Sequence, residues 1–216
     1  MAAVMTYATL VADMILYAER STDSVFIAQV PKLIAFAENK IAREIKGLGQ
    51  QQSVGDTMIP NNPILQKPDR WRETISINYG TGTNSTTRNQ LFARSLEFCR
   101  NYWPDPAVVA PAANLKYYAD YDYSHWLLAG TPGSAYPYEV IYYERAVPLD
   151  ATNQTNWNTA FAPDFLLAAC MLECQPFLKN TERMAMWEAI YDRGAQGFDK
   201  ENKRRTVDRA TLVDKG

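Results

Sequence analysis

The chain has 216 residues, enough for one domain, or one domain with a large insertion, to bury a core without disulfides or structural metals. Its 22 Lys and Arg residues are balanced by 24 Asp and Glu residues, which gives a formal net charge of -2. Because this charge provides no general attraction for phosphate backbones, we expect no bulk binding of nucleic acid.

The three cysteines, Cys99, Cys170 and Cys174, are an odd number, and their spacing does not match a disulfide framework. We interpret them as reduced thiols of a protein that is made in the cytosol. The first residues contain no basic segment, and Asp13 interrupts the apolar residues that follow. The sequence therefore predicts neither an export signal nor a membrane-spanning helix.

The N-terminal part has the spacing of amphipathic helices. Apolar residues recur every three or four positions over residues 6–20, where Thr6 is a candidate N-cap. A short helical piece at 26–28 follows, and Pro31 predicts the start of a second helix. We expect that helix to end near Gly47, a residue suited to the left-handed conformation beyond a helix end.

The middle of the chain changes to the alternation typical of β-strands. Residues 48–67 are rich in Gly, Gln, Asn and Pro, which predicts loop or short strand. Strands are predicted at 75–79, 91–93, 115–121, 125–128 and 138–144, with a short helix capped by Ser95 and a polar turn at 80–87. Together these segments predict a small, mainly antiparallel sheet.

Helical spacing returns after Pro148. A short helix is predicted at 155–161, an apolar helix opens at Pro163, and Pro176 should kink or restart it. Asn180 and Thr181 then cap a last helix.

The predicted fold class is α+β. The N- and C-terminal helices, within 1–47 and 148–199, form one bundle, residues 48–147 form the β-rich insertion, and residues 200–216 form an extended C-terminal tail.

Candidate catalytic and metal-binding residues are few. His125 is the single histidine, so no second imidazole is present for a metal, and a structural or surface role is the simpler interpretation. Cys170 and Cys174 lie four residues apart on an apolar helical face, as buried small side chains do. The Gly-Thr-Gly-Thr segment at 80–83 does not continue into the Gly-Lys-Ser of a phosphate loop. We predict no catalytic residue, no bound cofactor and no metal.

Aromatic residues are concentrated in two segments of the middle, 116–126 and 136–143. They exceed what a small sheet needs for its interior, so part of them can anchor an interface, while core packing remains the alternative. The candidates for a subunit or tail interface are Tyr117, Tyr121, Tyr123, Trp126 and Tyr142. Asp105, Asp120 and Asp122 stand beside these aromatic residues, and such carboxylates also occur in carbohydrate sites and ordinary turns.

Several segments resemble head-to-tail adaptor proteins of tailed bacteriophages. The similarity covers 138–149, 153–157, 162–173 and 176–179, and residues 26–43 resemble the first long helix of that family. The resemblance implies a helical bundle with a β insertion, assembled as a dodecameric ring beneath the portal protein. It also implies similarity to the upper tail proteins of short-tailed phages, which receive a tail nozzle or tail-tube protein on their other side.

The resemblance gives two further segments an expected role in the virion. The basic C-terminal segment contains the candidate portal-binding residues, which are Lys203, Arg204, Arg205 and Arg209, with a solvated tail as the alternative. Thr83 and Asn84, in the polar turn, are candidates for contact with the next tail component. Genomic DNA would pass through the ring without specific binding, which suits a slightly acidic chain.

Two other classes of function remain open on the sequence. One is a tail-associated carbohydrate- or receptor-binding module, which would bind glycans in solution. The other is a small hydrolase, which would lose a measurable activity when one carboxylate or His125 is changed. An adaptor would instead form a ring, alone or on its portal.

Overall fold

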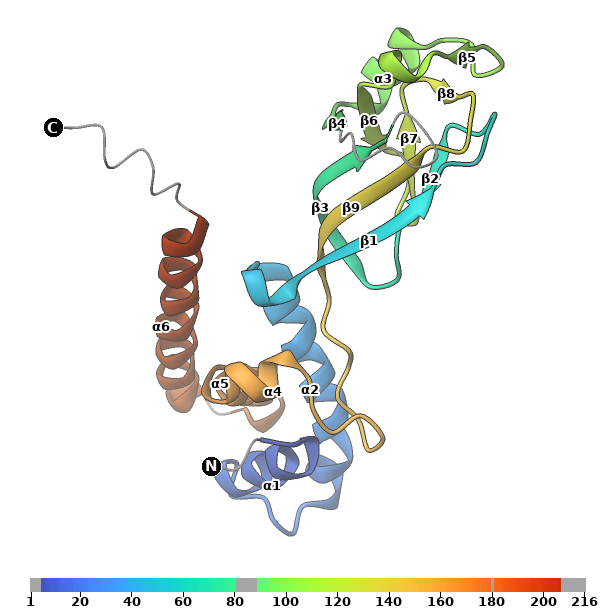
Figure 1. Ribbon diagram of the computed structural model, residues 1–216. Helices are drawn as coiled ribbons and strands as arrows, with labels where there is room; N and C mark the ends of the chain where they lie inside the picture. Colours follow the sequence, from blue (N-terminus) through green and yellow to red (C-terminus); the bar gives the residue numbers. More distant parts are fainter. Residues whose placement is uncertain (1–4, 81–88, 180, 207–216) are drawn as a thin grey trace, which may run out of the picture. The chain divides into compact units, whose positions relative to one another are not determined.

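The computed structural model describes residues 5–80, 89–179 and 181–206. The chain divides into two units (Figure 1). The helical unit contains Met1–Gln50 and Arg145–Gly216, and the sheet unit contains Gln51–Glu144. The predicted α+β class, with an antiparallel sheet inserted between terminal helices, is confirmed. Within the described residues, no helix has the length and apolar character needed to cross a membrane.

The helical unit consists of helices from both ends of the chain. They are α1 (Tyr7–Tyr17), α2 (Ser24–Glu44), the 3-10 turn η1 (Leu48–Gln50), α4 (Trp157–Phe161), α5 (Pro163–Leu178) and α6 (Thr181–Thr206). Thr6 caps α1 as predicted, because its side chain accepts a hydrogen bond from the backbone N–H of Thr9. Asp23 caps α2 in the same way, through the N–H groups of Val25 and Phe26.

Helix α2 differs from its prediction at both ends. It runs through Pro31 without interruption, so the predicted restart at this proline is wrong. The buried stripe of α2 continues on both sides of the proline, with Val30 before it and Leu33 after it, and this burial outweighs one lost backbone hydrogen bond. The helix ends at Glu44, the next residue, Ile45, is extended, and Gly47 does not take the left-handed conformation.

Helices α5 and α6 also extend further than predicted. Pro176 lies inside α5, which ends only at Leu178, just before the left-handed residue Lys179. Helix α6 continues to Thr206, so residues 200–206 are helical and not extended. The side-chain amide of Asn202 donates to the Lys46 carbonyl over 3.0 Å, a contact that holds this last part of the helix. Residues 207–216 of the predicted tail lie outside the described part of the chain.

Helix α5 is the centre of the helical unit. It contacts α1 and α2 from before the insertion, and α4 and α6 from after it. Its buried residues include Leu166, Ala169, Cys170, Met171 and Cys174. Phe165 stacks on Tyr191 of α6 with ring centroids 4.6 Å apart. The core of this unit is therefore made jointly by the two ends of the sequence.

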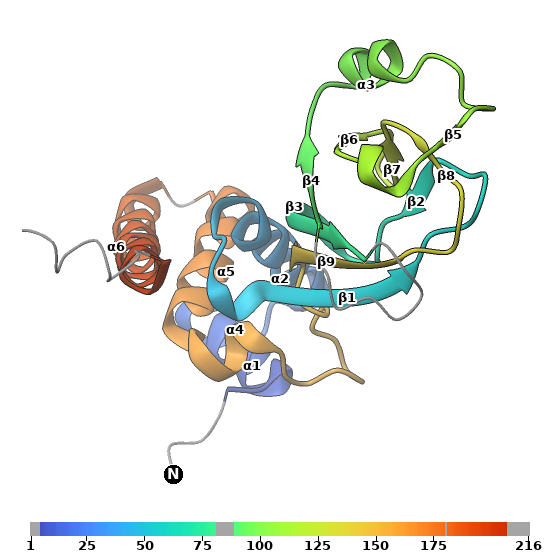
Figure 2. The same cartoon turned by 45° about the horizontal axis from the view of Figure 1, so that its top comes forward.

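The sheet unit contains a seven-stranded sheet in the order β1-β9-β3-β4-β6-β7-β2 (Figure 2). The strands are β1 (Gln51–Thr57), β2 (Ile64–Gln66), β3 (Trp71–Tyr79), β4 (Asn89–Ala93), β6 (Tyr117–Asp120), β7 (His125–Leu128) and β9 (Pro137–Glu144). All its pairings are antiparallel except β4 with β6. Strands β1 and β9 lie side by side along their whole length.

Smaller elements complete the sheet unit. They are α3 (Leu96–Tyr102), capped by Ser95 as predicted, the 3-10 turn η2 (Ala112–Asn114), and a parallel pair of β5 (Val109–Ala110) and β8 (Thr131–Pro132). The largest fully buried side chain is Trp126, which packs with Ile77, Leu91 and Val140 in a core separate from that of the helices.

Two adjacent residues of α2, Glu38 and Asn39, hold the segment that follows the last strand of the sheet. The Glu38 side chain is only 7% exposed, and its carboxylate accepts hydrogen bonds from the Leu149 backbone N–H (3.2 Å) and the Asn156 side chain (2.7 Å). Asn39 accepts from the Arg145 guanidinium over 2.9 Å. Burial raises the pKa of Glu38, although both hydrogen bonds oppose that shift.

We predict that Glu38→Gln changes the pH dependence of stability. Because the pKa of Glu38 is raised in the folded state, its contribution is complete below the ordinary value of 4.5 and is lost as pH rises through the raised pKa. The free energy of unfolding of the wild type should therefore fall relative to that of the variant as the pH rises from 4.5 through the raised pKa of Glu38. Urea unfolding at a series of pH values measures it, and a difference that moves the opposite way would contradict the assignment.

Two glycines of α6 provide a matched test of the packing between α5 and α6. A Cβ atom at Gly194 would lie 2.6 Å from the Phe165 ring, whereas one at Gly197 would have no neighbour within 4 Å. Gly197→Ala should stabilise the fold by up to about 1 kcal/mol through helix propensity. Gly194→Ala should destabilise it by about 1 to 3 kcal/mol through overpacking. Thermal unfolding compares them, and equal effects would refute the close packing.

Candidate assembly surfaces

A buried lysine organises one end of the sheet. The Lys67 side chain is 2% exposed, and its ammonium group lies 2.7 Å from the Asp120 carboxylate and 2.9 Å from the Asp122 carbonyl oxygen. The same group lies 3.7 Å from the centre of the Trp71 ring. Since these contacts join the segment before β3 to the turn between β6 and β7, they hold that turn in one conformation.

The predicted interface aromatics separate into exposed and buried residues. Tyr121 and Tyr123 lie on the β6–β7 turn and are 41% and 67% exposed. Trp126 and Tyr142 belong to the core of the sheet unit, because inward-facing positions alternate along β7 and β9. The aromatic residues that remain candidates for a subunit or tail interface are therefore Tyr121, Tyr123 and the half-buried Tyr117.

The sequence did not indicate that α3 belongs to the same aromatic surface. Phe98 and Tyr102 are 38% and 40% exposed, and both rings contact Tyr117 edge-on at 5.1 Å. The i, i+4 spacing of Phe98 and Tyr102 places them on one helical face, and this was the available signal. We define the aromatic surface of the sheet unit as Phe98, Tyr102 and Tyr117, whereas the Tyr123 ring packs edge-on against Trp71.

The residues considered for catalysis or sugar binding have local structural partners. His125 Nδ1 lies 2.9 Å from both carboxylate oxygens of Asp122, and this hydrogen bond lowers the pKa of Asp122. Asp120 pairs with Lys67, and Asp105 accepts from the Ala107 backbone N–H. These contacts give all three carboxylates a role in holding turns.

The cysteines are buried and free. Burial raises the pKa of all three thiols, that of Cys174 to about 12. A high pKa leaves little thiolate for metal binding or nucleophilic attack. Among the described residues, no group of three or more His, Cys, Asp or Glu side chains is arranged to hold a metal ion.

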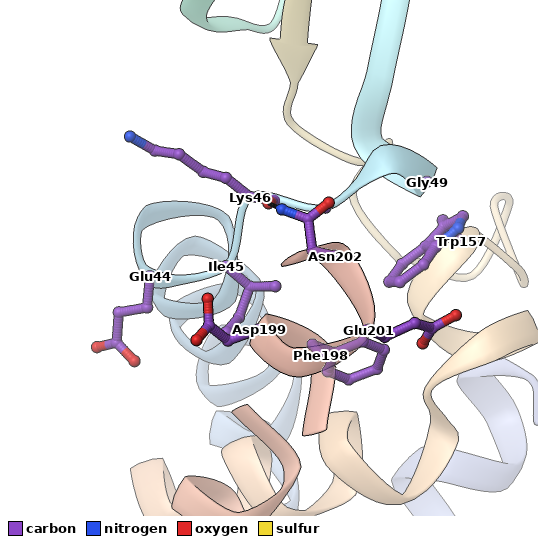
Figure 3. Close-up of a pocket in the computed structure, with 10 residues that line it drawn as sticks. Glu44, Ile45, Lys46, Gly49, Trp157, Phe198, Asp199, Glu201 and Asn202 are labelled. Atoms are coloured by element: carbon purple, nitrogen blue, oxygen red, sulfur yellow. Dashed lines mark hydrogen bonds between the residues drawn. The ribbon is translucent and has the colours of Figure 1, made fainter. Parts of the chain in front are cut away.

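The C-terminal end of α6 packs beside a groove in the helical unit (Figure 3). Phe198 of α6 faces Trp157, with the two ring centroids 5.9 Å apart, and the Asn202 side chain points toward Lys46. Gly49 approaches the Trp157 indole so closely that any side chain there would collide with it. These contacts fix the helix just before its basic residues.

The candidate portal-binding residues lie on and beyond this helix end. Lys203 is exposed, and its ammonium group lies 2.7 Å from the Asp199 carboxylate. Arg204 and Arg205 belong to α6, but the positions of their side chains lie outside the description. Arg209, Thr83 and Asn84 fall outside the described residues.

The opposite end of the helical unit exposes apolar side chains. The Tyr17 and Trp187 rings are 5.7 Å apart, and those of Phe26 and Phe177 are 6.0 Å apart. These pairs bring together the end of α1, the starts of α2 and α6, and the end of α5. Exposed apolar residues there are Leu16, Tyr17, Val25, Phe177 and Met184. We call these residues the apolar bundle end, and such a cluster is typical of an interaction surface.

A family model matches residues 5–213, which include almost all of both units. The chain belongs to the SU10 adaptor protein family. It is thus a structural adaptor protein of a bacteriophage, and this supports the resemblance to head-to-tail adaptors. A comparison with curated proteins finds no match.

Proposed function

We propose that this adaptor protein forms the dodecameric ring that connects the phage portal to the tail and continues the channel for DNA. The observation that carries the proposal is the family match, because it extends over both the helical and the sheet unit. The protein would then be a component of the virion, located at the head–tail interface, and its role would be structural and not catalytic.

The exposed apolar residues support a protein that works in contact with others. In a closed ring each subunit meets its two neighbours through two different surfaces, and an adaptor also meets a protein above and one below. The apolar bundle end and the aromatic surface belong to different units of the chain. Both carry large side chains that are costly to leave in water.

The charge of the chain supports a channel that lets DNA pass. A net charge of -2 gives no general attraction for the phosphate backbone. Tight binding of the genomic DNA by the adaptor would hinder ejection of the genome. Passage without specific binding is therefore the role that we assign to DNA.

The portal contact is assigned to the end of α6 and the residues after it. This segment contains Lys203, Arg204, Arg205 and Arg209, which can pair with acidic groups on a partner. The helix is anchored up to Asn202 by its bond to Lys46, so the basic residues begin where the anchored part ends. The downstream tail nozzle or tail-tube protein would meet the sheet unit.

The proposal predicts a ring that depends on the basic segment for portal attachment. The wild-type protein should form a dodecamer, alone or on addition of the portal of the same phage. Deletion of residues 203–216 should abolish co-purification with the portal, because the charged contact is lost. Light scattering after size exclusion measures both. Dispersed monomers in the presence of portal would contradict the ring, and full attachment of the truncated protein would contradict the portal assignment.

A further inference from the structure

The two edge strands of the sheet differ in how they are protected. Strand β2 is three residues long and lies between Pro63 and Pro68, and the Asn62 side chain accepts the Ile64 N–H. Strand β1 is seven residues long and pairs with β9 in one continuous register. It contains no proline, no lysine and no bulge. Natural proteins use these devices to block unwanted pairing, so β2 is protected and β1 is not.

The hydrogen-bond pattern shows which groups of β1 face outward. Beyond the end of β1, the Met58 N–H donates to the Tyr136 carbonyl over 2.8 Å. Since antiparallel partners alternate, Gln52, Val54 and Asp56 direct their backbone groups to β9. The N–H and carbonyl groups of Gln51, Ser53 and Gly55 point away from the sheet. Within the described part of the chain, β1 pairs with no strand other than β9.

The side chains of β1 do not obstruct this edge. Ser53 and Gly55 are exposed and small, so a second backbone can approach closely. Asp56 is the only charged residue of the strand, and its carboxylate accepts a hydrogen bond from the Tyr138 hydroxyl on β9. The same carboxylate accepts the Thr57 N–H over 2.7 Å, which closes the edge after Gly55. The open part of the edge therefore extends from Gln51 to Gly55.

The symmetry of a ring restricts which segment can occupy this edge, and this step rests on the proposed function. Pairing of β1 with β1 of a second copy requires a two-fold axis between subunits, which a ring with only rotational symmetry does not have. Pairing with β2 of a neighbour is blocked by its short length and its prolines. The described sheet unit offers no other free strand of matching length.

We infer that β1 is a docking edge for an extended segment of the downstream tail protein, which adds to the sheet as a further strand. The main chain of Gln51, Ser53 and Gly55 supplies the hydrogen bonds, as in other complexes formed by strand addition. The occupant would be a segment without proline at its paired positions and with small or β-branched side chains opposite Ser53.

The matched variants are Ser53→Pro and Gln66→Pro. Proline at 53 removes one outward N–H and leaves the backbone hydrogen bonds to β9 intact, since Ser53 does not direct its backbone to that strand. It also removes the hydrogen bond that the Ser53 hydroxyl donates to the Glu139 carboxylate on β9 over 3.0 Å. Gln66 is the equivalent outward position on β2, because Pro63 and Lys67 direct their backbone groups toward β7 and its preceding turn. Each variant is supplied to a phage that lacks the gene, and the purified particles are imaged. Circular dichroism and thermal unfolding of each purified protein check that it folds.

Ser53→Pro should give heads that contain portal and adaptor but lack the tail, whereas Gln66→Pro should give tailed particles. Amide hydrogen exchange of the wild type provides a test without substitution. The amides of Gln51, Ser53 and Gly55 should exchange rapidly in tailless particles and slowly in tailed ones. Tailed Ser53→Pro particles, or exchange that is equal in both particle types, would overturn the inference. Absence of the wild-type chain from the head–tail junction would instead overturn the proposed function.

Discussion

The helical unit depends on the return of the chain after the sheet. Helix α5 packs against α1 and α2 from before the sheet and against α4 and α6 from after it, so neither end of the sequence can complete the core alone. The Glu38 carboxylate, held by Leu149 and Asn156, fastens the returning segment to α2. A buried carboxylate without these donors would cost several kcal/mol, roughly, so the bonds and the path of the chain support each other.

The residues that fill the two cores are different from those that remain exposed. The chain re-enters the helical unit beside Asn39 and Glu38, and the sheet unit has a core of its own, which contains Trp126, Tyr138 and Tyr142. The aromatic residues of the sheet unit that are not part of this core, and the open edge of β1, lie at the surface. Such a separation of core residues from contact residues suits a protein that acts by assembly, because a stable core leaves its surface residues available for binding partners.

The sequence predicted the elements better than their limits. The periodicity of apolar residues placed the helices and most strands, and local caps such as Thr6 and Ser95 were read correctly. It failed at Pro31 and at the end of α6, where packing against distant residues extends a helix beyond its local signals. Tyr142 could not be assigned to the core from its type alone, since register decides which face is buried. The apolar bundle end could not be predicted either, because it forms only when the ends of helices that are distant in the sequence come together in the fold.

The most direct test of the account is a cryo-EM reconstruction of the intact virion with the chain traced in the density. The account predicts twelve copies in one ring between the portal and the first tail protein, with the end of α6 at the portal. A virion in which the chain lies elsewhere, or in which the portal contacts the tail directly, would contradict it.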